Sequence, residues 1–328
     1  MPGFIGSQAL SVNTPQRILV IRGGAIGDFI LTLPALRALR KTFPDAWIEI
    51  MGYPATAEIA HHRYYADAVS RVDAADIAPL FTPEGALPER RLARLRQFDL
   101  AVCFWKDEPG LLSVNLRRVG IPQVLCADPF PPAGRKVHAA AHMLEAISPL
   151  VGRGHDPAPR IFLNDADDSF GRQFLAPLRT QGPAPVLAAH PGSGGKHKCW
   201  PAPCFAALME KAAAERQARW LLLCGPADAN ACAEVRQNLP RVRPVMVEGL
   251  SLLQLASVLS ACDGYLGNDS GVTHLAAAVG APTLAIFGPT DPAVWGPVGE
   301  NVKTIASSPW PTVEQVWPSL AEIVRLGA

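Results

Sequence analysis

Short apolar segments alternate with amphipathic stretches along most of the chain, and this alternation restricts the fold more than any other feature. Strands that alternate with helices predict parallel βαβ units, and near-continuously apolar strands predict a sheet covered on both faces. The predicted strands are 17–22, 46–51, 98–104, 122–126, 185–190, 219–224, 244–247, 263–267 and 282–287, and the helical stretches include 29–41, 201–216, 228–239, 251–260 and 271–279.

The alternation stops around residues 150–165. The segment LVGRGHDPAPRIFLND is rich in proline, glycine and polar residues and lacks an apolar period, which is typical of a linker. We therefore predict two α/β domains, 17–155 and 156–328, with a flexible tail at 1–16. The cleft between two such domains is the expected ligand site. We expect the last helical stretch, about 312–326, to pack back across this cleft onto the first domain.

The composition disfavours several classes of protein. Hydrophobic residues make up 49% of the 328 residues, and the net charge is only +1, so nucleic-acid binding by bulk electrostatics is not expected. The seven cysteines contain no CxxC pair and fit reduced thiols better than disulfides or a zinc site. No apolar run approaches the ~18–20 residues of a membrane span. Because the N-terminus also lacks the pattern of a secretory signal, we expect a cytoplasmic protein.

The first candidate site motif is GGAIGD, residues 23–28, between a predicted strand and a predicted helix. Glycines at such a turn allow a ligand to approach the backbone, and a helix N-terminus favours an anion. The dinucleotide pattern GxGxxG is absent, however, and a carboxylate, Asp28, lies at the helix start. Two interpretations of Asp28 stay open: a helix cap, or a general base at the carboxyl end of a strand.

The second motif, HPGSGGKHKCWP at 190–201, also follows a predicted strand. Its glycines and Ser193 form a loop of the size that binds phosphate, and Lys196 and Lys198 add positive charge. Because the Walker pattern GxxxxGK[ST] is absent, the loop is interpreted either as an exposed basic loop or as a pyrophosphate site.

The third motif is GNDSGVTHLAAAVGAPTLAIFGPTDP, residues 267–292. A predicted turn leads into a helix rich in small residues. Ser270 and Gly271 are expected to present a hydroxyl and backbone N–H groups to an anion at the helix N-terminus. Asp269 can accept hydrogen bonds from sugar hydroxyls, and His274 lies on the first turn of the same helix.

Together and in this order, the three motifs resemble glycosyltransferase family nine, the ADP-heptose:lipopolysaccharide heptosyltransferases. The resemblance covers most of the chain and is strongest in ILVIRGGAIGDFILTLPALRALRKTFPDA and in the two later motifs. It implies the GT-B fold, in which two Rossmann-like domains face a cleft, the first binding the acceptor and the second the nucleotide sugar. It also implies an inverting transfer of heptose from ADP-L-glycero-D-manno-heptose to a lipopolysaccharide inner-core acceptor, without a metal or another cofactor.

The resemblance further implies roles for individual residues. Asp28 matches the family's catalytic base on the acceptor side. Lys198 matches a contact to the donor phosphate and sugar, and Asp269 matches the residue that holds the heptose hydroxyls. The other matching positions are Gly23, Gly24 and Gly27 in the acceptor-side loop, and Ser193, Ser270, Gly271 and His274 in the donor site.

The acceptor side contains no motif that can be matched. A lipid-linked oligosaccharide acceptor would bring the protein to the cytoplasmic face of the inner membrane as a peripheral protein. The alternatives are a family member with another nucleotide sugar or another surface-glycan or protein acceptor, a non-catalytic GT-B scaffold, and a Rossmann oxidoreductase, which the missing GxGxxG disfavours. The basic candidates for holding an acidic acceptor are Arg63, Arg71, Arg90, Arg91 and Arg94.

Overall fold

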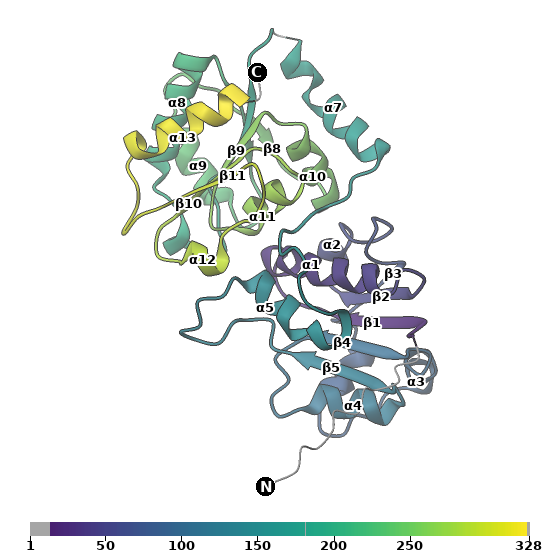
Figure 1. The fold of residues 1–328 in the computed structure, drawn as a ribbon. Helices are drawn as coiled ribbons and strands as arrows, with labels where there is room; N and C mark the ends of the chain where they lie inside the picture. Colours follow the sequence, from purple (N-terminus) through teal and green to yellow (C-terminus); the bar gives the residue numbers. More distant parts are fainter. Residues whose placement is uncertain (1–13, 181, 327–328) are drawn as a thin grey trace.

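The computed structural model describes residues 14–180 and 182–326, and it contains two α/β domains, which Figure 1 shows one above the other. The first domain contains β1 (Arg17–Ile21), α1 (Ile26–Thr42), β2 (Trp47–Gly52), α2 (Pro54–Ala57), β3 (Ala68–Arg71), the 3-10 helix η1 (Ala75–Phe81), α3 (Glu89–Leu95), β4 (Leu100–Phe104), α4 (Leu111–Val119), β5 (Gln123–Ala127), α5 (Ala139–Ala146) and α6 (Ser148–Val151).

The second domain begins after a connecting segment at 152–164. It contains α7 (Asp165–Arg179), β6 (Val186–His190), the 3-10 helix η2 (Lys196–Lys198), α8 (Ala202–Arg216), β7 (Arg219–Leu223), α9 (Ala229–Gln237), β8 (Val245–Val247), α10 (Leu252–Ser260), β9 (Gly264–Asn268), α11 (Gly271–Ala278), β10 (Thr283–Phe287), α12 (Pro292–Trp295), β11 (Val302–Ala306) and α13 (Val313–Leu326).

Each domain is built on a sheet whose strands are all parallel. The first sheet has the order β3-β2-β1-β4-β5, and the second has the order β11-β10-β9-β6-β7-β8. Both orders reverse direction beside the first strand of the domain, as in doubly wound nucleotide-binding folds. The predicted fold class is therefore confirmed.

All nine predicted strands are present, but two strands were missed. β3 has the sequence AVSR and β11 has the sequence VKTIA, and each lies at an edge of its sheet. An edge strand has a neighbour on one side only and exposes part of its surface. It therefore lacks the apolar run by which buried parallel strands are recognised.

Helix α1 lies where the two domains meet. Its buried side chains, Phe29 through Leu39 apart from Arg37, cover more than one face of the helix. A helix that is apolar nearly all round must be covered on several sides. Here α1 packs on α5 of its own domain and on α11 of the other domain (Figure 1).

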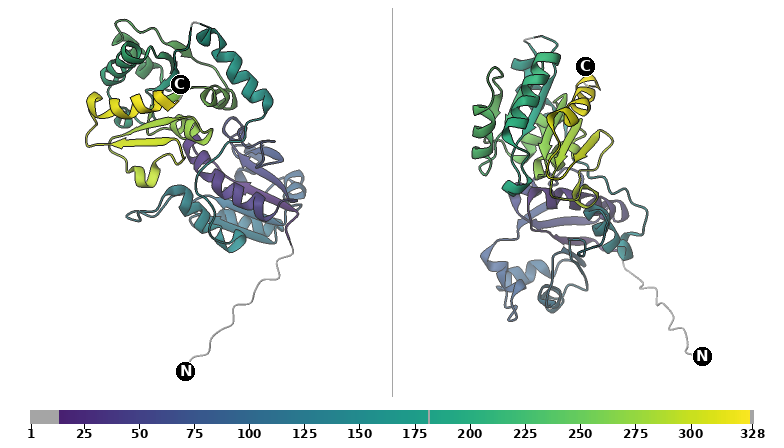
Figure 2. Two further views of the ribbon diagram at one scale, coloured as in Figure 1. Left: turned by 45° about the horizontal axis from the view of Figure 1, so that its top comes forward. Right: turned by 90° about the vertical axis from the view of Figure 1, so that its left-hand side faces the viewer.

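The expectation for the last helix is wrong. Helix α13 packs on α8 and on the strands β9 and β10 of the second domain. Its apolar stripe, which includes Val316, Leu320 and Ile323, is buried in the core of the second domain. Both views in Figure 2 show α13, in yellow, on that domain. The predicted tail at 1–16 lies outside the described residues except for residues 14–16.

Within 14–180 and 182–326, none of the helices combines the length and the apolar character that crossing a membrane requires.

Candidate active site

The topology places all three sequence motifs at the carboxyl edges of the sheets. The GGAIGD turn follows β1, the Lys198 loop follows β6, and Asp269 follows β9. The strand order changes direction between β1 and β4 in the first sheet and between β6 and β9 in the second. The three loops follow strands that lie at these two points. Ligands of doubly wound folds bind in the crevice outside such a change of direction.

The two edges meet through a contact between glycines. A Cβ atom added to Gly271 would lie 2.8 Å from the amide nitrogen of Gly27 and 2.8 Å from Cβ of Ile26. A Cβ atom added to Gly27 would lie 3.3 Å from Cδ2 of His274. Glycine at both positions therefore allows the start of α1 and the start of α11 to touch. Asp28 directly follows Gly27, so the turn that carries Asp28 lies against the second domain.

Asp28 is the third residue of α1 and is half-buried. Its Oδ2 accepts a hydrogen bond from the backbone N–H of Ala25 at 3.0 Å, which satisfies one of the free donors at the helix start. Asp28 thus caps the helix from inside the first turn and not from the N-cap position. The capping interpretation is supported directly, and it leaves the carboxylate near the domain junction.

Arg22 is a neighbour of Asp28 that the sequence interpretation missed. It is 4% exposed, and its Nη2 donates to the backbone carbonyl of Asp28 at 3.1 Å, while its Nε donates to Thr32 at 3.0 Å. Burial lowers the pKa of Arg22, and the charge of Asp28 opposes that change. A charged residue at the end of an apolar strand was the available sequence signal.

On the donor side, the predicted residues gather around Asp269. The Lys198 ammonium lies 2.8 Å from Oδ2 of Asp269, and the Ser193 hydroxyl donates to the Asp269 backbone carbonyl at 2.6 Å. Thr290, which was not predicted, donates to the same Oδ2 at 2.8 Å. Asp269 is only 8% exposed, so these bonds hold its carboxylate in a fixed place.

The Ser270 hydroxyl has partners within the second domain. Ser270 is the N-cap of α11, and its hydroxyl accepts the backbone N–H of Thr273. The same hydroxyl lies 3.2 Å from Nδ1 of His190 and 3.1 Å from the Thr273 hydroxyl. Its side chain is therefore engaged inside the domain, and the N–H groups of Gly271 and Val272 at the start of α11 are the donors left for an anion.

Behind Ser270 lies a contact between a histidine and a carboxylate that the sequence interpretation also missed. Nε2 of His190 lies 3.1 Å from Oδ2 of Asp228, and the same oxygen accepts the backbone N–H of Gly225. Burial alone would raise the pKa of Asp228. The hydrogen bond and charge of His190 have the larger combined effect, so the pKa is lowered. The chain Asp228–His190–Ser270 thus fixes the start of α11 from behind.

His274 lies between the two halves of the site. Burial lowers its pKa to about 4; the charges of Asp269 and Asp28 oppose this, and His138 adds to it. His274 is therefore neutral near pH 7. His274 lies next to Gly27, and the charges of both Asp28 and Asp269 act on its ring.

The comparisons with known proteins match this arrangement. Residues 139–322, more than half of the chain, match the family described as "Glycosyltransferase family 9 (heptosyltransferase)". The chain belongs to glycosyltransferase family 9.

Relatives of this family 9 glycosyltransferase include two curated lipopolysaccharide enzymes. Lipopolysaccharide heptosyltransferase 1 of Pseudomonas aeruginosa is 28% identical over 321 residues, which cover 87% of this chain and 82% of the relative. Lipopolysaccharide heptosyltransferase 3 of Escherichia coli K12 is 23% identical over 297 residues, which cover 84% of this chain and 83% of the relative.

Solved structures confirm the GT-B fold. The family 9 glycosyl transferase from Veillonella parvula superposes with a TM-score of 0.79 at 19% identity, over 95% of this chain and 97% of that one. The E. coli ADP-heptose lipopolysaccharide heptosyltransferase II superposes with a TM-score of 0.74 at 18% identity, over 94% of this chain and 99% of that one.

In the family 9 enzyme, each of the five arginines named for an acidic acceptor has a carboxylate partner. Arg63 reaches across the domain junction to Asp167 on α7, with Nε 2.8 Å from Oδ2. Arg94 lies 2.8 Å from the buried carboxylate of Glu49. The other ion pairs are Arg71 with Asp73, and Arg90 and Arg91 with Asp76.

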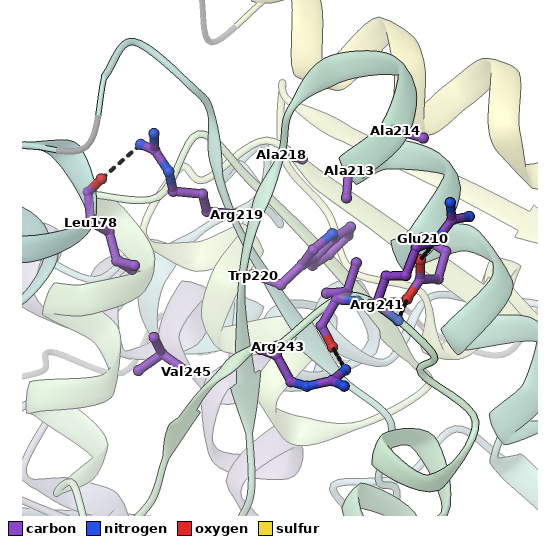
Figure 3. A pocket seen from close by; sticks show the side chains of 11 residues that line it. Leu178, Glu210, Ala213, Ala214, Ala218, Arg219, Trp220, Arg241, Arg243 and Val245 are labelled. Carbon is purple, nitrogen blue, oxygen red and sulfur yellow. Dashed lines mark hydrogen bonds and ion pairs between the residues drawn. The ribbon is translucent and has the colours of Figure 1, made fainter.

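A cavity of about 510 Å³ in the second domain lies apart from this site (Figure 3). It is lined by the first residues of β7 and by Val245 of β8, so it opens at the amino edge of the sheet. Its polar groups serve the local structure: Arg219 donates to the Leu178 carbonyl at 2.7 Å, and Glu210 accepts the backbone N–H groups of Arg241 and Val242.

In the part of the chain that the structure describes, no group of three or more His, Cys, Asp or Glu side chains is placed to hold a metal ion.

Proposed function

We propose that this family 9 glycosyltransferase moves heptose from ADP-L-glycero-D-manno-heptose to an inner-core sugar of lipopolysaccharide, with inversion at the anomeric carbon. The observation that carries the proposal is the contact of Gly27 with Gly271, which brings the Asp28 loop beside the Lys198–Asp269 pair. The names of the curated relatives, lipopolysaccharide heptosyltransferases 1 and 3, support the substrate class.

The residues supply the groups that an inverting transfer needs. Asp28 takes the proton from the acceptor hydroxyl as the oxygen attacks the anomeric carbon of heptose. The bond from that carbon to the diphosphate oxygen breaks, and ADP leaves with the bonding electrons. Lys198 and the first-turn N–H groups of α11 stabilise the negative charge that develops on the diphosphate. Asp269 binds heptose hydroxyls and keeps the sugar in line with the acceptor.

The proposed acceptor is a lipid-linked oligosaccharide, so we place the enzyme in the cytoplasm, in peripheral contact with the inner face of the inner membrane. Fractionation of cells tests this placement. We expect the protein in the soluble pool or in the pool released by salt, and release by detergent alone would contradict it.

A donor screen tests the function. The purified enzyme is incubated with a defined inner-core acceptor and with ADP-heptose, UDP-sugars or GDP-mannose in turn, and products are identified by mass spectrometry. We expect the acceptor to gain one heptose from ADP-heptose and nothing from the other donors. Transfer from a different nucleotide sugar would replace the donor in the proposal, and binding of ADP-heptose without transfer to any acceptor would favour a non-catalytic scaffold.

A further inference from the structure

Three aromatic side chains follow strands of the first sheet at the edge that carries Asp28. Tyr53 follows β2, Trp105 follows β4 and Phe130 comes shortly after β5. Tyr53 and Phe130 are 42% and 43% exposed, and Trp105 is half-buried. Single exposed apolar side chains are ordinary on a protein surface, but a group of them beside an active site indicates a binding surface.

Contacts place the rings beside the glycine turn. A Cβ atom added to Gly23 would lie 2.9 Å from Cζ3 of Trp105 and 3.7 Å from Cε2 of Tyr53. The Phe130 ring centre lies 5.9 Å from the guanidinium carbon of Arg22, which in turn bonds to the Asp28 carbonyl. All three rings therefore border the short turn that ends at Asp28.

Two of the rings are supported by further aromatic side chains. The Trp105 ring lies 4.8 Å from the ring of Phe81, and the Phe130 ring lies 6.2 Å from that of Trp295 on α12 of the second domain. Such contacts restrict the motion of the two rings before a ligand arrives, which reduces the entropy lost on binding.

We infer that Tyr53, Trp105 and Phe130 bind the acceptor sugar by stacking against the apolar C–H face of its pyranose ring. This inference rests on the proposed function, because the hydroxyl that Asp28 deprotonates must belong to a sugar at this turn. A pyranose has an apolar C–H face and carries its hydroxyls around the edge. Aromatic rings can cover that face while an edge hydroxyl remains open to Asp28.

Two of the acceptor-side arginines are already paired with buried carboxylates. Arg63 is paired with Asp167 and Arg94 with Glu49, and these carboxylates are 8% and 1% exposed. An acceptor that took over either arginine completely would displace its carboxylate. Displacement would leave a buried carboxylate without its partner, which is strongly unfavourable. The three rings require no such exchange.

The test uses the full-length enzyme with a deacylated inner-core oligosaccharide as the acceptor probe. The variants are Tyr53→Ala and Phe130→Ala, with Tyr53→Phe as the conservative rescue. Tyr64→Ala is the matched control, because Tyr64 is 44% exposed but contacts Tyr65 and Phe162 away from the turn. Calorimetric titration gives the Kd for the oligosaccharide without transfer, and steady-state kinetics gives KM for the acceptor and for ADP-heptose separately.

We expect each alanine variant to raise the acceptor Kd and KM about five- to tenfold, the effect of losing one aromatic contact. The donor KM and the melting temperature should stay at the wild-type values, and Tyr53→Phe and Tyr64→Ala should behave as wild type. A wild-type enzyme that binds the oligosaccharide but transfers nothing would overturn the proposed function, and the titrations would still decide the inference. Unchanged acceptor Kd in both alanine variants, or no oligosaccharide binding by the wild type, would overturn the inference.

Discussion

Gly271 of the second domain touches Gly27 of the first so closely that a Cβ atom on Gly271 would lie 2.8 Å from the Gly27 amide nitrogen. The contact is between backbones, so no side-chain rotation can relieve an added methyl group. It joins α1, whose third residue is the proposed base Asp28, to α11, whose N-terminus faces the proposed diphosphate. The spacing of the two catalytic halves therefore depends on two residues without side chains.

Substitution Gly271→Ala should separate these halves. The methyl group must push α1 away from α11, at a cost of about 1–3 kcal/mol for an overpacked contact. We expect transfer to fall at least tenfold, because a small misplacement of reacting groups reduces catalysis strongly. The measurements are transfer rate and melting temperature. Gly194→Ala is the control for stability, since no atom lies within 4 Å of its added Cβ. A Gly271→Ala enzyme with full activity would mean that the close contact does not position the site.

Substitution Lys198→Ala should weaken use of the donor. A charge-assisted hydrogen bond to phosphate contributes about 1.5–3 kcal/mol, which corresponds to roughly a ten- to hundredfold loss in kcat/KM for ADP-heptose. Lys196→Ala is the control, because Lys196 carries the same charge but is exposed. Equal losses in both variants would show that the loop acts by its net charge and not through the Lys198 ammonium beside Asp269.

Much of this site could be predicted from the sequence because the strands and active-site loops of parallel α/β folds have clear local sequence patterns. A buried parallel strand is a continuous apolar run, and the loop after it carries the polar residues of the site. GGAIGD, the loop that contains Lys198, and Asp269 all follow such runs, so their shared edge could be predicted from the pattern.

Other features depend on contacts between distant segments, which no local pattern records. His190 and Asp228 are 38 residues apart and meet only because β6 and β7 are neighbours in the sheet. Whether the Ser270 hydroxyl faces a ligand or caps its helix depends on the partner that reaches it, here His190. The carboxylate partners of the five acceptor-side arginines were likewise not recognisable from spacing alone.

The ion pair of Arg63 with Asp167 should make stability depend on pH. Burial raises the pKa of Asp167, but hydrogen bonds from Arg63 and from the Asn164 amide outweigh burial and lower it. Because the folded-state pKa is below the unfolded value of about 3.9, the pair stabilises the fold above that value. The stabilisation is lost as pH falls through the folded-state pKa. Melting curves of wild type and Asp167→Asn should therefore differ near pH 7, and the difference should shrink as pH falls below about 3.9 and through the folded-state pKa. A constant difference across that range would contradict the assignment.

The central claim is that Asp28 is the general base as well as a cap, and Asp28→Asn separates the two roles. The Asn side-chain oxygen can accept the same Ala25 N–H, so the fold should lose at most about 1 kcal/mol, from the weaker interaction with the helix dipole. An amide cannot take the proton of the acceptor hydroxyl, and losing a positioned base removes roughly 10²–10⁴ in rate. The decisive measurement is the rate of heptose transfer by Asp28→Asn, taken with its melting temperature and its affinity for ADP-heptose. We predict a transfer rate lower by at least about a hundredfold with near wild-type stability and donor affinity; transfer close to the wild-type rate would contradict the claim and reduce Asp28 to a capping residue.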